Sequence, residues 1–460
     1  MRASWKRTAR ALALAVLVSG TAACDWLISP TESNPNVVAD ATLDQLFVSV
    51  QLNAWFIAEG DLSRFAAVWL QQMAGMQDRQ FGLIHSYDIV EDDGGDAFNT
   101  TYTGGGLVDI VRAIDLATER PEAAGRVYAG ILKVHQAFMI GTIASVHGDV
   151  PFSEAVNPEI AEPALDDQAA VYAAVQALLD EAIADLQSGE GAGPGAIDFS
   201  FGGNAAQWVA VANTLKARFH AHWMETDPGR AAQVLAAANS GIRTAAGNWR
   251  ALHSTTATEQ NLWNQFMGDR PNYIQAGAFL VDLLLARDDP RVAKYYEPNA
   301  DGEFVGSPVN EEDVTASNLA LCAGCAGAQD FGFVLASCEE NAGLAAEAAF
   351  RQGGAAAAQP WIDELIQCSS TFWGVDVPPA QQPLTLEEII LQKYMALFLS
   401  HEIWSDYKRT CFPAVETFAG REIPRRLYYP FAERQANTNV PEPAEQDAQP
   451  FNDNDPNPCP

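Results

Sequence analysis

The sequence predicts a mostly α-helical protein, in which a scaffold of repeated helical pairs carries a loop-rich subdomain with disulfides. Two observations predict this fold class. Apolar residues recur at intervals of three and four over most of residues 41–249, which is the period of a helix with one buried face. Runs that alternate apolar and polar residues, as a half-buried strand does, are few. The chain has 460 residues, of which 48% are hydrophobic, enough to build such a core.

The helical pattern begins near residue 41 and continues through several segments. One face of the first helix collects apolar side chains: Leu43, Leu46, Phe47 and Val50. Residues 167–187 give the clearest apolar stripe, and Asp166 or Asp167 precedes it as a capping side chain. Further helices are predicted at 62–76, 107–117, 123–146, 204–224 and 229–246. Helical pairs that repeat over about 35–40 residues are similar to tetratricopeptide pairs, so 41–249 is predicted to be a tetratricopeptide-like scaffold.

The pattern changes after the scaffold. Residues 250–380 contain many Gly and Pro and only scattered helical periods, at 274–286 and 341–352. We therefore expect a loop-rich, ligand-facing subdomain there. A strong helix is predicted over 385–409, and residues 381–460 are expected to pack back on the scaffold as a C-terminal helix and tail. Short strand-like runs occur at 81–90 and 304–310.

The first residues of the chain have the order of an export signal. Basic residues up to Arg10 precede a short apolar run over 11–18, and small residues then lead to Cys24. This order is typical of a secretory signal, and the run is too short to span a membrane. A cysteine directly after small residues is the arrangement of a bacterial lipobox. Residues 1–23 are therefore predicted to be a lipoprotein signal peptide, Cys24 the lipidation site and 24–40 a tether; the alternative is an ordinary signal cleaved elsewhere.

The cysteine count agrees with export. There are seven cysteines, so lipidation of Cys24 leaves an even number, as a set of disulfides in an oxidising space requires. The sequence does not choose among the pairings. A rival interpretation is a zinc site on Cys322 and Cys325, but the second close pair or paired His of such sites is missing. Disulfides are therefore predicted at Cys322, Cys325, Cys338, Cys368, Cys411 and Cys459.

The net charge and the absence of catalytic motifs from the sequence limit the classes of function that the protein can have. The formal net charge of −32 repels phosphates, so nucleic acid is excluded as a partner, and a neutral or cationic ligand fits better. Signatures such as Gly-x-Ser-x-Gly, His-Glu-x-x-His and a Walker loop do not occur in the sequence. His220 and His222 are two apart on a predicted helix, point to different faces and make a poor metal pair. We expect no catalysis, no metal site and no cofactor, with structural calcium left open.

Motifs along nearly the whole chain then occur together and in order. Residues 131–155 contain a long helical pattern followed by Gly-Asp-Val-Pro, and residues 163–186 contain a Tyr and a Leu-x-x-Ala-Ile-x-x-Leu pattern. Four more motifs follow: Trp208 with 212–218, Asp289-Pro290-Arg291, Glu402-x-Trp404-x-Asp406-Tyr407-x-Arg409, and 423–430. In register, these segments resemble the SusD/RagB nutrient-binding outer-membrane lipoproteins, most closely the SusD-like branch that ends in Arg-Arg-x-x-Tyr-Pro.

The resemblance implies a lipid-anchored binding protein on the outer face of the bacterial outer membrane. Members of this family look like lids on a TonB-dependent β-barrel transporter of the SusC type. They capture oligosaccharides, or peptides in some members, and deliver them to the barrel. An oligosaccharide is therefore the expected ligand. The alternatives are a peptide-binding member of the same family and an envelope scaffold without a role in transport.

The resemblance also directs attention to aromatic residues on loops. In this family rings stack on the apolar faces of sugars, while Asn, Asp and Arg bond the hydroxyls. Two stretches of the chain are predicted to be such loops. Within 81–106 the candidate ligand-binding residues are Phe81, Tyr87, Phe98, Asn99 and Tyr102. Within the segment WNQFMGDRPNY they are Trp263, Arg270, Asn272 and Tyr273.

Overall fold

The computed structural model describes residues 41–76, 80–119 and 125–447, together with 452, 454, 455 and 459. The predicted signal peptide, Cys24 and the predicted tether lie outside the described residues. The chain divides into a first unit that ends at Gln45 and a second unit, Leu46–Pro460. Everything said below of contacts concerns the second unit.

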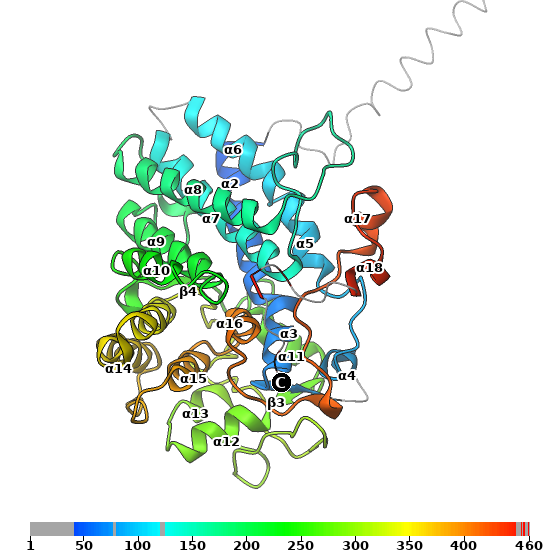
Figure 1. Cartoon of the computed structure of the whole chain (residues 1–460), viewed down its shortest axis with the longest axis vertical. Coiled ribbons are helices and arrows are strands. Elements are labelled where there is room, and N and C mark those ends of the chain that lie inside the picture. The colour runs from blue at the N-terminus through cyan, green and yellow to red at the C-terminus, as the bar shows by residue number, and fades with distance from the viewer. Residues whose placement is uncertain are drawn as a thin grey trace, which may run out of the picture. The chain divides into compact units, whose positions relative to one another are not determined.

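The described residues confirm the mostly α-helical fold class (Figure 1). Two small antiparallel sheets pair β1 (Met73–Gly75) with β3 (Ile274–Ala276) and β2 (Trp249–Arg250) with β4 (Val334–Ala336). The helices are α2 (Leu43–Glu59), α3 (Asp61–Trp69), α4 (Gln80–His85), α5 (Gly95–Tyr102), α6 (Leu107–Glu119), α7 (Gly125–His147), α8 (Gln168–Gln187), α9 (Ala205–Ala221), α10 (Arg230–Ala238), α11 (Leu262–Asp269), α12 (Ala278–Ala286), α13 (Val292–Tyr295), α14 (Cys338–Trp373), α15 (Leu386–Ala396), α16 (Glu402–Thr410), α17 (Phe431–Ala436) and α18 (Pro443–Asp447).

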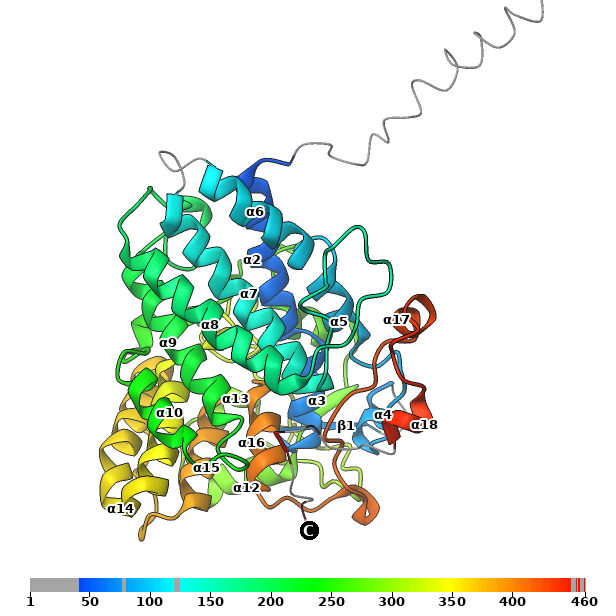
Figure 2. The same cartoon turned by 45° about the horizontal axis from the view of Figure 1, so that its top comes forward.

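Helices α7 to α10 form the centre of the helical-repeat scaffold, in which neighbours along the chain lie side by side (Figure 2). By length and composition α7 is apolar enough to cross a membrane, but 94% of its apolar window is buried inside the protein, as in a core helix. Gly141 lets α7 and α9 approach closely, because a Cβ there would lie 2.3 Å from the Phe219 ring. Gly148, at φ +91°, ends α7.

The start of α8 follows the predicted capping chemistry. The Asp167 carboxylate accepts a hydrogen bond from the backbone N–H of Ala170 at 3.1 Å. Its neighbour Asp166 accepts instead from the backbone N–H groups of Phe152 and Ser153, at 2.8 Å each. Asp167 is thus the helix cap, and Asp166 fixes the turn that precedes it.

Helix α14 is the largest departure from the sequence prediction, because it occupies part of the stretch predicted as loop-rich. It is interrupted at Gly354, where φ is +69° and ψ is −165°, so that its two halves turn back on one another. Cys338 in the first half and Cys368 in the second have Cα atoms 6.0 Å apart and form a disulfide. The first half, which is largely buried, contains the helical segment predicted at 341–352, whereas the second half was not predicted.

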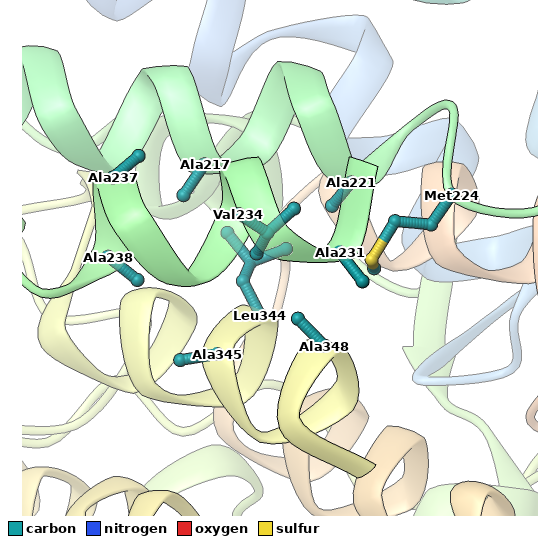
Figure 3. Packing of buried hydrophobic residues seen from close by; sticks show 10 residues of the cluster. All are labelled: Ala217, Ala221, Met224, Ala231, Val234, Ala237, Ala238, Leu344, Ala345 and Ala348. Carbon is teal, nitrogen blue, oxygen red and sulfur yellow. The ribbon is translucent and has the colours of Figure 1, made fainter. Parts of the chain in front are cut away.

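The first half of α14 continues the scaffold beyond residue 249. In one core cluster, Leu344, Ala345 and Ala348 of α14 pack against Val234 of α10 and the Met224 side chain that follows α9 (Figure 3). Small side chains on the facing surfaces allow this close packing. The helical framework is therefore longer than the predicted range 41–249.

Buried ion pairs attach α16 to α14 and α15 to α16, the latter through Lys393 and Asp406 at 2.8 Å. The predicted helix 385–409 is broken between them, where Leu399 has φ +66°. Arg409 of α16 binds both Glu347 of α14 and Asp406, the latter at 2.6 Å. Burial alone would raise the pKa of Glu347, but the charge and hydrogen bonds of Arg409 lower it to about 2. Glu347 is therefore charged and paired with Arg409 at neutral pH.

The remaining cysteines also pair. Cys322 bonds Cys325, and Cys411 bonds Cys459, so all six predicted cysteines form disulfides and none is left for the rival zinc site. The predicted strand-like runs are wrong. Residues 81–85 belong to α4, and in the described chain 304–310 contributes only an isolated bridge from Ser307 to Gly277.

Candidate functional site

Helix α2 carries apolar side chains on two faces, of which one is fully buried and the other is only partly covered by protein. The covered face includes Phe47, Val50, Ala54 and Ile57, all buried. The second face follows the spacing i, i+4, i+7 and i+11, and consists of Val48, Leu52, the buried Trp55 and, at its end, the buried acid Glu59. Leu52 on this face is 48% exposed. A large apolar side chain that stays in water beside an aromatic ring marks a candidate binding surface.

This second face of α2 forms one wall of a groove of about 740 Å³. The opposite wall comes from residues 252–260 and the start of α11, and Phe199 contributes from the Gly-rich segment 188–203. Ligand sites of a few hundred Å³ are usually apolar with a few polar groups, as here. The lining residues are Val48, Leu52, Trp55, Phe56, Glu59, Phe199, Leu252, His253, Ser254, Thr258, Glu259, Gln260, Leu262 and Gln265.

A buried glutamine holds Phe199 in place at the groove. The side chain of Gln51, which is fully buried, accepts a hydrogen bond from the Phe199 N–H at 3.0 Å. It also donates to the Ile197 carbonyl at 3.2 Å. The Phe199 ring, 44% exposed, lies 6.2 Å from the Trp55 ring between centroids. Two rings are therefore held near one another at the groove although one of them sits on a loop.

Glu59 joins the two walls of the groove. Its Oε1 accepts from the backbone N–H of Leu262, the first residue of α11, at 2.5 Å. Its Oε2 lies 2.8 Å from Nε2 of His253 on the opposite wall. The other ring nitrogen of His253, Nδ1, lies 3.2 Å from the Glu259 carbonyl oxygen. Both ring nitrogens thus face acceptors, and an imidazolium satisfies both of them.

The electrostatics of the groove follow from this pairing. Burial disfavours the charged form of His253, but the hydrogen bond and charge of Glu59 outweigh it and raise the pKa of the imidazole. The other lining acid, Glu259, accepts from the Ser254 hydroxyl at 2.6 Å. Among the described residues that line the groove there is no Lys or Arg. The groove therefore offers an anionic ligand no unpaired positive charge.

The stretch 81–106 is not a single loop, because half of it lies in α4 and α5. Phe81, Tyr87 and Phe98 are all buried, so their rings offer no face to a ligand in this structure. Phe98 packs against the rings of Tyr102, His147 and Tyr429. Tyr87 accepts from the Phe418 N–H at 3.3 Å, and burial raises the pKa of its hydroxyl to about 12. Of the predicted side chains here, Asn99 is exposed and Tyr102 is half-buried.

The second predicted stretch is also not a simple loop. Trp263 lies in α11 and is fully buried, and its Nε1–H donates to the Ser63 hydroxyl at 2.9 Å. The expectation that Trp263 projects from a polar loop is therefore wrong. Arg270 and Asn272 are exposed just after the helix, and Tyr273 is half-buried. The fold does join the two stretches, since Phe81 meets Phe266 of α11 edge-on at 5.3 Å.

The groove residues carried a signal in the sequence that the predictions did not use. Val48, Leu52 and Trp55 extend the apolar part of α2 around to a second face, which is wider than one buried stripe needs. Phe199 is an aromatic residue in a Gly-rich, polar segment, the same signal that pointed to 81–106. The sequence did not show that the two walls of the groove contact one another, because Glu59 and His253 are 194 residues apart.

The described part of the chain contains no cluster of side chains suited to a metal ion. There, no group of three or more His, Cys, Asp or Glu side chains is placed to hold a metal ion. His220 and His222 are both buried, and His222 Nε2 lies 2.9 Å from the Glu402 carboxylate on α16. These two histidines belong to the polar packing of the scaffold.

Comparison with known proteins identifies the family. The family model SusD-like_2, described as starch-binding and associating with the outer membrane, matches residues 35–430. The chain belongs to this SusD-like family. None of the curated proteins compared with it matches.

Solved structures agree on the fold of this SusD-like protein. It is similar to a SusD/RagB family protein from Bacteroides thetaiotaomicron, with a TM-score of 0.74 and 20% identity over 91% of this chain and 98% of the other. A SusD homologue from Bacteroides fragilis gives 0.74 and 19% over 91% and 98%. A chitin-binding SusD homologue from Flavobacterium johnsoniae gives 0.72 and 18% over 86% and 94%. At these identities the similarity establishes the shared fold.

Proposed function

We propose that this protein captures an oligosaccharide in the groove between α2 and residues 252–265. The observation that carries the proposal is the groove itself. Phe199, which is exposed, and Phe56, which is half-buried, provide ring faces of the kind that stack on sugars, and Thr258 and Gln260 provide polar groups for hydroxyls. Family membership supports nutrient binding at the outer membrane. The chitin-binding relatives favour a sugar over a peptide as the ligand.

The proposal includes the place of the protein in the cell. Lipidation at Cys24 would anchor it to the outer membrane, and more than one acyl chain is needed for stable anchoring. We propose that it then delivers its ligand to a TonB-dependent transporter of the SusC type. Support comes from the outer-membrane association of the family and from the order of residues before Cys24.

We also propose that the ligand is bound and not converted. Glycoside hydrolysis needs two carboxylates beside the scissile bond, one of them available as an acid. Both oxygens of Glu59 already accept hydrogen bonds within the protein. Mass spectrometry after long incubation should therefore recover the bound oligosaccharide unchanged.

The central experiment compares two phenylalanine variants on a glycan and peptide array. Phe199→Ala removes an exposed ring from the groove, and Phe431→Ala removes a similarly exposed ring elsewhere, at 41% exposure. Phe199→Ala should lose the glycan signal of the parent protein, because stacking on this ring is lost, whereas Phe431→Ala should keep it. Equal binding by both variants, or binding to peptides alone, would refute the proposal.

Delivery is tested separately in cells. Affinity purification of the protein from detergent-solubilised outer membranes should bring down a TonB-dependent β-barrel. A Cys24→Ala variant should be released from the membrane fraction. Recovery of the protein without any β-barrel partner would support the alternative of an envelope scaffold.

A further inference from the structure

From the chemistry of the groove we infer a ligand class: an uncharged chain of N-acylated amino sugars. This inference rests on the proposed function, since it assumes that the groove binds a glycan. It goes further by specifying which substituent the sugar rings carry. Three features of the lining lead to it: aliphatic side chains beside the rings, the absence of unpaired cations and the internal pairing of the carboxylates.

The aliphatic side chains are the first feature. Leu52 and Leu252 face one groove from opposite walls and are 48% and 44% exposed, and Val48 and Leu262 line it as well. The hydroxyls of a plain hexose gain nothing from leucine. An acyl methyl group does, because burying apolar surface is favourable in proportion to its area. The groove therefore suits sugars that carry a small apolar group beside the ring.

Charge is the second feature. An anionic sugar, such as a uronate or sulfated residue, would enter a groove whose lining holds two glutamates and no Lys or Arg among its described residues. His253, the one basic side chain there, is already bonded to Glu59 at 2.8 Å. An anionic group would thus lose its hydration without gaining a partner, which is costly. The groove selects against anionic chains.

The third feature separates acylated amines from free amines. A cationic amino sugar would need a carboxylate that is free to pair with it. Glu59 has both oxygens engaged, with Leu262 N–H and His253, and is 1% exposed. Glu259 is exposed and bonded to Ser254 through one oxygen, so it would give only a weak, screened surface pair. A neutral amide meets none of these difficulties, and the amide side chains of Gln260 and Gln265 can bond it.

The test uses three hexasaccharides with the same β-1,4-linked glucose backbone that differ only at carbon 2. Cellohexaose carries a hydroxyl, the glucosamine hexamer an ammonium group and the N-acetylglucosamine hexamer an acetamido group. Titration calorimetry on the purified protein should show the acetamido chain binding at least about tenfold tighter than either other chain, which corresponds to about 1.4 kcal/mol. Equal or tighter binding of cellohexaose or of the glucosamine hexamer would overturn the inference.

Variants locate the preference in the groove. Leu52→Ser and Leu252→Ser should reduce the advantage of the acetamido chain over cellohexaose. Leu321→Ser, at a leucine that is 42% exposed outside the groove lining, should leave that advantage unchanged. All three sites are exposed, so the folded state should tolerate the changes. An advantage that survives both groove variants would overturn the inference.

A fourth probe distinguishes two sources of N-acylated chains. A peptidoglycan tetrasaccharide carries a lactyl carboxylate on alternate sugars and should bind more weakly than the N-acetylglucosamine tetramer. Tighter binding of the lactyl chain would contradict the charge argument. A different result would refute the proposed function itself: Phe199→Ala would then bind every glycan on the array as well as the parent protein does. If cellohexaose binds most tightly and its binding is lost in Phe199→Ala, the inference about N-acylated sugars is wrong but the proposed function stands.

Discussion

Helix α11 contributes to two aromatic regions that differ in what covers the rings. On one face, Trp263 is fully buried, bonded to Ser63 of α3. On another, Leu262 and Gln265 line the groove, where Phe199 stays 44% exposed. Both regions combine aromatic rings with polar neighbours in sequence. An aromatic residue in a polar stretch thus becomes part of a binding surface only where no other segment of the chain covers it.

The largest expected effect is in the buried region. Trp263→Ala should destabilise the protein by about 3–5 kcal/mol, as truncation of a core Trp does. Phe199→Ala should change stability by less than about 0.5 kcal/mol, as exposed sites do. Denaturant unfolding of both variants measures the contrast. A small loss for Trp263→Ala would mean that the ring is not packed as described, and would return it to the candidates for ligand binding.

The link between the two walls of the groove should have an intermediate effect. Glu59→Gln replaces the charged acceptor of Leu262 N–H and His253, and hydrogen bonds to charged groups contribute about 1.5–3 kcal/mol each. We therefore expect a loss of stability near that range, with weaker ligand binding as the walls separate. Glu259→Gln, at an exposed neighbouring acid, should be close to neutral. Similar losses in both variants would contradict the role of Glu59.

The smallest effect concerns pH. Because Glu59 raises the pKa of His253 above its ordinary value of 6.5, the folded protein holds this proton more tightly than the unfolded chain. The resulting stabilisation is fully present below pH 6.5 and is lost as the pH rises through the raised pKa. His253→Gln should remove this part of the pH dependence. Unfolding curves of parent and variant that stay parallel across this pH range would argue against the pairing.

Much of the fold followed from the sequence. The helical period of 167–187 and the capping residue Asp167 predicted both ends of α8 to within about a residue. Such a prediction is possible because a local apolar pattern and a local hydrogen bond determine where this helix lies. Helix α14 was predicted only in part, at 341–352 in its first half. Its second half was missed because Gly353, Gly354 and the internal Pro360 suggest a loop where the chain in fact turns between two helices.

The site was less predictable, because exposure depends on contacts between distant residues. Trp263 is buried by α3, 200 residues away along the chain. Phe199 is held at the groove by Gln51, 148 residues away. Both aromatic residues stand in polar stretches of the sequence, and the distant residue that each one contacts decides whether its ring is buried or exposed. The second apolar face of α2 was the one local signal, and it becomes meaningful only when the covered face is known.

The burial of Asn454 and Asp455 has a consequence for the order of events during biosynthesis. Asp455 bonds Arg425 at 2.6 Å, and Asn454 donates to the Tyr172 hydroxyl of α8 at 3.3 Å. Helix α8 leaves the ribosome long before these residues do. The interior beside α8 therefore stays incomplete until a segment made some 280 residues later arrives. A chain halted before that segment would be recognisable as unfinished to chaperones and proteases.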